Sequence, residues 1–358
     1  MRRILKRFTG LFCVLALCLS MLPVSALAAE DAPSNQPTTL LSDDNVAKIE
    51  ENEYPTLDEA VEAAEDGATI ELLADATTKG WNLTKSLTIT SAPDLAEKPT
   101  VTFEKDGIAL WGKTLTFKGI DVVMNGVGST PYGEWTWMTI CASKDAVLAL
   151  DNVNMTMDAT GSTGSPHAIY FCSNNKLNLT NGSVLTIKNY PNDALEWDGG
   201  DGGYNVNITN STFISDHNRS GFTGTFYATI TNSKVDVVNN LGNGSNGSHF
   251  IIEDSEVNFN NNGSHGLSAG ELSIDNSTVN TKNNNGMGIT VNNAFTVENG
   301  SIVTVTGNAG NPSYGYAAVR LYNDYPFTVD STSELYIEDN NNTGLYVRQG
   351  NLAVEDGA

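Results

Sequence analysis

Hydrophobic and polar residues alternate along this chain in a short phrase that recurs ten times. The phrase reads apolar, any, apolar, any, and then a turn residue that is usually Asn. Successive phrases begin at intervals of roughly 20–30 residues, a period that indicates a solenoid. Their first residues are Leu115, Leu148, Leu177, Val206, Ala228, Phe250, Leu272, Phe295, Phe327 and Leu352. We therefore interpret the sequence as a stack of similar coils.

Each repeat contains three short strands separated by turns. The phrase itself is the first strand, because alternation with a period of two is typical of a strand with one buried face. The apolar pattern resumes three residues after the Asn, and a third strand follows a polar, Asn-rich turn. The expected second-strand core residues are Val122, Met155, Val184, Phe213, Val235, Val257, Val279 and Ile302. Third strands are expected at 168–171, 266–269, 288–291 and 344–347.

One repeat is too short to bury its own apolar residues, so neighbouring coils must stack about 4.8 Å apart, the ordinary strand spacing. The pattern thus predicts an all-β fold, a parallel β-helix. At the turn after the first strand we expect the Asn side chains to form an internal ladder, each amide bonding the next coil. Turn formation alone would also favour Asn at this position.

The N-terminal residues divide into a leader, a linker and a cap. Residues 1–28 are typical of a secretory signal peptide, with a basic start, an apolar run and the cleavage motif Ala26-Leu27-Ala28. Residues 29–45 are polar and form the expected linker. Within the cap, residues 46–75, Thr56 and Glu59 form a capping box that begins a helix. The predicted apolar face of this helix consists of Leu57, Ala60, Val61 and Ala64.

Residues 54–73, followed by Asn-rich coils, resemble the right-handed parallel β-helix surface proteins of Gram-positive bacteria, which share the pectate-lyase-like fold. The resemblance covers nearly everything from Val46 onward. It implies a right-handed solenoid with an N-terminal capping α-helix, and secretion. It implies no particular activity, because the fold carries lyases, hydrolases, adhesins and stalks. The coils, residues 76–358, end within a repeat phrase, so we expect this chain to be the N-terminal part of a longer protein.

The chain is strongly acidic. It carries 19 basic and 42 acidic residues, a net charge of −23. The predicted leader holds four of the basic residues and none of the acidic ones, so its removal leaves 15 against 42, a net charge of −27. Such a chain repels nucleic acid and anionic lipid, and repels uronate polymers unless a cation bridges them. Solubility of a long solenoid also accounts for this charge.

Two cysteines remain after the leader is removed, Cys141 and Cys172. Aligning residues 138–141 with 169–172 places both on the same outward row of adjacent coils. Their Cα atoms would then lie one strand spacing apart, within the range for a disulfide. Stacked free thiols fit the same geometry, and two ligands are too few for a structural zinc site.

The coils lack the residue sets of two enzyme classes that use this fold. Polygalacturonases carry paired carboxylates, and here only His265 and Arg320 resemble parts of their motifs. Pectate lyases need a basic residue beside calcium. The third-strand region offers Arg219, Arg320 and Arg348, which we expect to lie away from acidic clusters.

An acidic cluster lies in the third coil, between Asp193 and Asp201. Because Leu195 and Trp197 alternate inward, Glu196 and Asp198 should point outward, about 7 Å apart. The alignment places Glu196 beside Tyr170, and Asp193 beside His167. The two outward carboxylates could act as acid and base, bind calcium, or simply be solvated.

Aromatic residues gather near the same coils. Trp135 and Trp137 share parity with Thr139 and Cys141, so all four should face outward. Tyr170 and Tyr204 follow one and two coils later. Outward aromatic rings suit stacking on sugar rings. The alternative is that neighbouring loops bury the tryptophans as a satellite core.

The leading hypothesis is a secreted or cell-surface adhesin, a β-helix that binds or displays toward glycans or a host surface. Its predicted binding residues are Trp135, Trp137, Tyr170, Glu196, Asp198 and Tyr204. A polysaccharide lyase or glycoside hydrolase is the alternative, and a passive stalk is the third. A compact outward cluster of carboxylates with a base would favour the enzyme. We expect no metal site, no cofactor except calcium as an alternative, no nucleic-acid partner and no membrane insertion.

Overall fold

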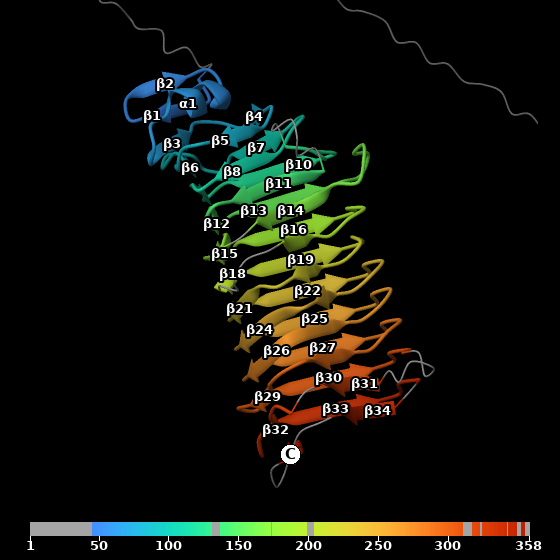
Figure 1. Ribbon diagram of the computed structural model, residues 1–358. Coiled ribbons are helices and arrows are strands. Elements are labelled where there is room, and N and C mark those ends of the chain that lie inside the picture. The colour runs from blue at the N-terminus through green and yellow to red at the C-terminus, as the bar shows by residue number, and fades with distance from the viewer. Residues whose placement is uncertain are drawn as a thin grey trace, which may run out of the picture. The chain divides into compact units, whose positions relative to one another are not determined.

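The computed structural model describes residues 45–130, 137–172, 174–198, 204–310, 317–322, 324–341, 343–348 and 352–354. These residues form a parallel β-helix, in which successive coils stack and the strands of each face pair in parallel, except that β1 (Ala47–Ile49) pairs antiparallel with β2 (Asn52–Tyr54) and β3 (Ala68–Leu72) at the N-terminal end (Figure 1). The fold predicted from the repeat is confirmed. The predicted leader and most of the linker lie outside the described residues.

The first sheet has 17 strands within the described residues. Its strands are β1, β2, β3, β6 (Leu87–Ser91), β9 (Thr114–Lys118), β12 (Val147–Asp151), β15 (Lys176–Thr180), β18 (Tyr204–Thr209), β21 (Tyr227–Thr231), β24 (Ser248–Glu253), β26 (Leu267–Asp275), β28 (Ile289–Val291), β29 (Phe295–Glu298), β31 (Ala317–Leu321), β32 (Phe327–Val329), β34 (Thr343–Val347) and β35 (Leu352–Val354). This sheet makes the first face and, through β28, β31 and β34, the third face of the later coils.

The second face is a sheet of 11 strands and the third a sheet of seven, again within the described residues. The second contains β4 (Ala76–Thr78), β7 (Thr100–Phe103), β10 (Asp121–Asn125), β13 (Asn154–Asp158), β16 (Val184–Lys188), β19 (Thr212–Asp216), β22 (Lys234–Val238), β25 (Glu256–Asn260), β27 (Thr278–Lys282), β30 (Ile302–Thr306) and β33 (Glu334–Glu338). The third contains β5 (Trp81–Leu83), β8 (Ile108–Trp111), β11 (Met138–Ser143), β14 (His167–Cys172), β17 (Leu195–Asp198), β20 (Phe222–Gly224) and β23 (Ser245–Asn246).

The first face confirms the predicted register. All ten first residues of the recurring phrase pair with one another in a single row, from Leu115 to Leu352. The row also extends to two earlier coils, through Leu87 and Ala68. Later along the stack β26 continues through the corner and pairs with both β28 and β29, which joins the third face to the first.

On the second face, the predicted inward residue is wrong by one position in two coils. Leu185 rather than Val184 pairs with Met155, and Val303 rather than Ile302 pairs with Val279. In both coils a glycine lengthens the preceding turn by one residue, Gly182 in one and Gly300 in the other. Both glycines have positive φ, +80° and +77°, which residues with a side chain rarely adopt. The added residue therefore turns Ile302 to solvent.

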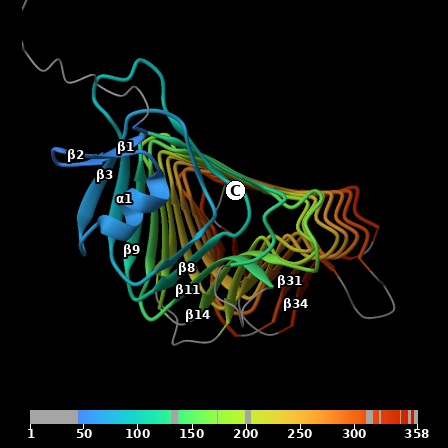
Figure 2. The same ribbon diagram turned by 90° about the horizontal axis from the view of Figure 1, so that it is seen from above.

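The N-terminal coil is covered by the single described helix, α1 (Leu57–Ala63). Thr56 is its N-cap and accepts a hydrogen bond from the Glu59 amide, as the capping box predicts. The predicted apolar face, including Ala64 just beyond the helix, is buried in the main core. Viewed from above, the coils lie one behind another with α1 across the N-terminal end (Figure 2). The helix thereby shields apolar residues that the first coil would otherwise expose.

The predicted internal ladder of Asn side chains after the first strand is wrong in its location. Asn210, Asn232 and Asn276 at this turn are exposed, with φ between +42° and +48°. They do bond between coils, as when the Asn232 amide donates to Asn210 Oδ1 at 2.5 Å, but on the outside. Asn is favoured here because it tolerates left-handed backbone.

Two other ladders are buried. Serine hydroxyls accept from backbone amides of the preceding coil at about 3.0 Å, and the serines form one row. The row includes Ser233, Ser255, Ser277, Ser301 and Ser333. A second row after the second strand consists of Asn218, Asn240, Asn262, Asn284, Asn308 and Asn340. These rows satisfy turn amides that stacking removes from water.

A membrane-spanning helix is not found among the described residues, since none of their helices combines the length and the hydropathy that a span requires.

Candidate functional site

The corner that leads into the third face breaks strict alternation in three successive coils. In each coil two consecutive residues point into the solenoid, so the residue before them points outward. The inward pairs are Thr139 with Ile140, Ala168 with Ile169, and Ala194 with Leu195. The outward residues before them are Met138, His167 and Asp193. His167 and Asp193 are thus brought to the outer surface of neighbouring coils.

Beyond the corner, β17 follows the predicted alternation. Leu195 and Trp197 are buried in the core, where the Trp197 ring stacks on Phe171 at a centroid distance of 4.1 Å. Glu196 is half-buried and Asp198 is exposed on the outer surface. The predicted contact of Glu196 with Tyr170 is confirmed by strand register.

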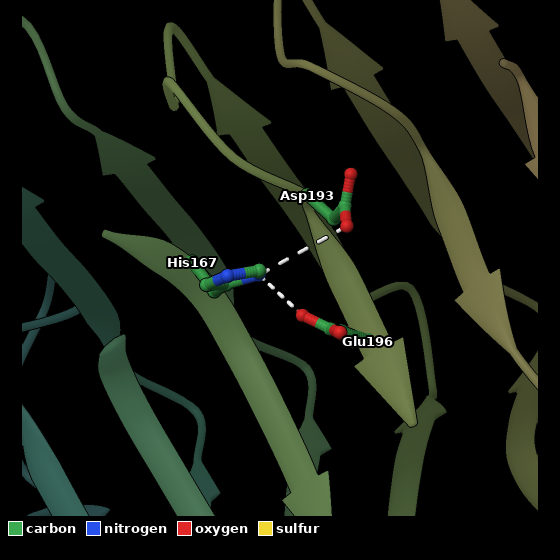
Figure 3. Close-up of side chains that lie close together, drawn as sticks. All are labelled: His167, Asp193 and Glu196. Carbon is green, nitrogen blue, oxygen red and sulfur yellow. Dashed lines mark ion pairs between the residues drawn. The ribbon is translucent and has the colours of Figure 1, made fainter. Parts of the chain in front are cut away.

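His167, Asp193 and Glu196 form a compact group on this surface (Figure 3). His167 Nδ1 forms a close ion pair with Glu196 Oε2 and lies 4.0 Å from Asp193 Oδ2. The backbone holds the arrangement, because the Ala168 amide donates to the Asp193 carbonyl at 3.1 Å. The side chains of His167 and Asp193 are only 12% and 7% exposed, so this part of the group is largely shielded from solvent.

Burial changes the acidity of Asp193. It raises the pKa of this carboxyl, and the nearby Glu196 carboxylate raises it further. Hydrogen bonding by Ser220 and the charges of His167 and Arg219 act in the opposite direction. Arg219 therefore does lie near an acidic cluster, contrary to the prediction, because the next coil carries it past Asp193.

Tyr170 does not belong to an exposed aromatic platform, which corrects the prediction. Its ring is 4% exposed and packs with Met138 and Cys141 in a small cluster separate from the main core. Its hydroxyl donates to Asp198 Oδ2 at 2.6 Å. Burial and this acceptor raise the Tyr170 pKa well above its usual range.

Trp137 does face outward, and its side chain is 39% exposed. Its ring meets the rings of Tyr170 and His167 edge to face, with centroid distances of 4.8 and 5.5 Å. Thr139, which was expected to share this orientation, points inward and bonds Tyr190. Trp135 lies outside the described residues, as does the side chain of Tyr204.

The predicted register of the two cysteines is wrong by two residues. Cys141 pairs with Tyr170, and Cys172 pairs with Asp198. In the structure Met138 pairs with His167 and Ile140 with Ile169, so the two coils are aligned two residues away from the predicted register. Both cysteines are free thiols. Burial raises the pKa of Cys141 to about 12.

The partial polygalacturonase motif has a structural role. His265 accepts a hydrogen bond from the Met287 amide at its Nδ1, 3.0 Å away, and so links one coil to the next. The Arg320 guanidinium lies 4.1 Å above the Tyr322 ring. Neither residue belongs to the acidic group on the third face.

Sequence reasoning placed Asp193 beside His167 but did not count either among the binding residues. The available signal was the register between the coils, which carries His167, Asp193 and Glu196 to one place. Strict alternation back from Tyr170 instead assigns His167 to the interior. The sequence did not show that two consecutive residues, Ala168 and Ile169, point inward at the corner, which turns His167 outward.

Comparisons with known proteins add little. No family model matches the chain, and no curated protein matches it. Among solved structures the chain is similar to a double mutant of the periplasmic alginate epimerase AlgG, with a TM-score of 0.31 and 11% sequence identity. The similarity covers 80% of this chain and 85% of that one. Likeness at this level carries no inference about activity.

Proposed function

We propose that this protein is a secreted or cell-surface β-helix that binds neutral glycans on its third face, around Trp137. The observation that carries the proposal is the exposed indole of Trp137 beside outward carboxylates. An exposed ring offers a flat apolar surface for a sugar ring. Glu196 and Asp198 supply hydrogen-bond acceptors for sugar hydroxyls next to it.

Charge narrows the class of ligand. The third face presents two carboxylates near Trp137, and the chain as a whole is strongly acidic. Like-charge repulsion disfavours uronates and sulfated sugars at this surface. One shallow ring contact gives weak affinity, so useful binding requires several sites presented together, as on a cell surface.

Retention on immobilised neutral polysaccharides tests this proposal. We expect Trp137→Ala to abolish retention, because it removes the stacking surface. Tyr336→Ala is a matched control, since Tyr336 is also an exposed aromatic residue, 42% exposed, but lies on the second face. Equal loss in both variants, or retention unchanged by Trp137→Ala, would contradict the proposal.

Cleavage of a neutral polysaccharide is the second candidate function. The observation that favours it is the His167–Glu196 ion pair beside Asp193, whose raised pKa suits an acid that is protonated closer to neutral pH. Release of new reducing ends by the purified chain, lost in Glu196→Gln, would support it. We expect no such release from pectate or polygalacturonate, with or without calcium.

A further inference from the structure

We propose that His167, Asp193 and Glu196 form a binding site for a divalent transition-metal ion, with zinc as the best match. The three side chains offer one imidazole nitrogen and two carboxylate oxygens. These ligand atoms all lie within 4.8 Å of one another. The site does not depend on glycan binding and assigns a separate property to the third face.

The spacing of the ligand atoms suits a small ion. Zinc lies about 2.0–2.2 Å from nitrogen and carboxylate ligands. His167 Nδ1 and Asp193 Oδ2 are 4.0 Å apart, whereas two ligands at the tetrahedral angle on one zinc ion lie about 3.4 Å apart, so a small approach of the two side chains would let both bind the same ion. Glu196 Oε2 already contacts the same nitrogen, and a side-chain rotation would move it to a third ligand position. The fourth position would face solvent, where a water molecule or a sugar hydroxyl could bind.

Unsatisfied polar atoms are the second observation. His167 Nδ1, Asp193 Oδ1 and Glu196 Oε2 are each inaccessible to solvent and lack an aligned hydrogen bond among the described residues. Buried polar atoms normally have a partner, and leaving one without costs free energy. Asp193 is buried, with 5% of its surface exposed, and its Oδ2 faces His167. A bound cation would satisfy His167 Nδ1 and Glu196 Oε2, and through Oδ2 it would balance the charge of the buried Asp193 carboxylate.

Charge points in the same direction. Two carboxylates meet beside one imidazole, and their mutual repulsion is relieved by a divalent ion. Arg219 from the next coil provides a partial counter-charge to Asp193, but its guanidinium is directed to Asn192 Oδ1 at 3.4 Å. The imidazole decides the kind of ion. Nitrogen ligands favour zinc and its transition-metal neighbours, whereas calcium and magnesium prefer oxygen ligands alone.

Metal binding is measured directly on the untagged chain after removal of metals with a chelator. Titration with zinc chloride followed by equilibrium dialysis should give one ion per chain. Each of His167→Ala, Asp193→Asn and Glu196→Gln should weaken zinc affinity by more than about tenfold, since even the loss of an outer partner costs 10–100-fold. Cobalt substitution gives a second readout, because its visible absorption reports the coordination geometry of the bound ion without any variant.

His217→Ala is the matched control. His217 Nδ1 also pairs with an acid, Asp216 Oδ1 at 2.7 Å, but has no third ligand in the described part of the chain. Its removal should leave zinc affinity unchanged. Absence of stoichiometric zinc binding, equal affinity in wild type and His167→Ala, or displacement of zinc by equimolar calcium would each overturn the proposal. Trp137→Ala should retain zinc while losing glycan, which separates this test from that of the proposed function.

Discussion

Replacing one rung of the buried Asn ladder should destabilise the solenoid strongly. In Asn262→Ala the lost side chain no longer accepts from Asn240, whose backbone amide and side-chain amide lie 3.1 and 3.0 Å away. It also no longer donates to the Val237 carbonyl and to Asn284 Oδ1, at 3.1 and 3.0 Å. Asn262 is 1% exposed, so water cannot replace these bonds.

The magnitude follows from the groups left without partners. Each buried donor that loses its acceptor costs about 1–3 kcal/mol, and Asn240 loses an acceptor for two donors. The expected loss is therefore about 2–6 kcal/mol. For a chain of this size the corresponding decrease in Tm is on the order of 3–10 °C. Amide hydrogen exchange should show the loss in the coils on either side of Asn262, because each coil contacts mainly its neighbours.

The adjacent residue provides the control for thermal unfolding followed by circular dichroism. Asn261 is exposed and has φ +58°, a conformation that glycine adopts without strain. Asn261→Gly should therefore change stability by less than about 0.5 kcal/mol. If Asn262→Ala unfolds at the wild-type temperature, or if both variants lose equal stability, the ladder does not contribute as argued.

Three further predictions concern other parts of the coils. Leu267→Asp should prevent cooperative folding, because Leu267 is fully buried and an unpaired charge there is costly; Leu241→Asp, at a site 75% exposed, should unfold as wild type does. Burial alone would raise the pKa of Asp158, but hydrogen bonds, one from Asn189, hold it well below 3.8. Its stabilisation is therefore present above pH 4 and lost as the pH falls, so Asp158→Asn should unfold with a shallower acid dependence in urea titrations from pH 5 to 2. Cys141, with its pKa raised to about 12, should resist iodoacetamide at pH 8 until the chain is unfolded, and its rapid alkylation in the folded protein would contradict the burial described.

The fold could be predicted because every coil must bury the apolar residues of its first strand in the same way. A first strand with two inward apolar residues must lie on its counterpart in the next coil, so the row from Leu115 to Leu352 was readable without coordinates. The second strand was misplaced by one residue only where Gly182 or Gly300 lengthens the turn. The serine that precedes the second strand from β16 onward marks the correct phase, since Ser183 and Ser301 both lie in the buried serine ladder.

The two sides of the Asn-rich turns were harder to assign. Asn261 and Asn262 are identical and adjacent, yet one is exposed with left-handed backbone and the other is buried with four side-chain hydrogen bonds. Residue type cannot separate these roles, because Asn suits both a positive φ and a buried amide ladder. Only the position of each Asn within the coil separates the two roles, and that position is known only from the geometry of the turn after the second strand.

The candidate site arises at the corner where strict alternation of inward and outward residues fails. Where two consecutive residues turn inward at the corner, parity fails for the residues before it, and those residues are His167 and Asp193. The alternation that correctly placed Glu196 therefore missed the partners that give Glu196 its chemistry. A regular solenoid face spreads its outward side chains along parallel rows, one for each coil. The break at this corner instead brings side chains from adjacent coils together at one point, which is the geometry that a metal ion requires. The irregular corner, rather than the repeat, is therefore where function is to be sought in this chain.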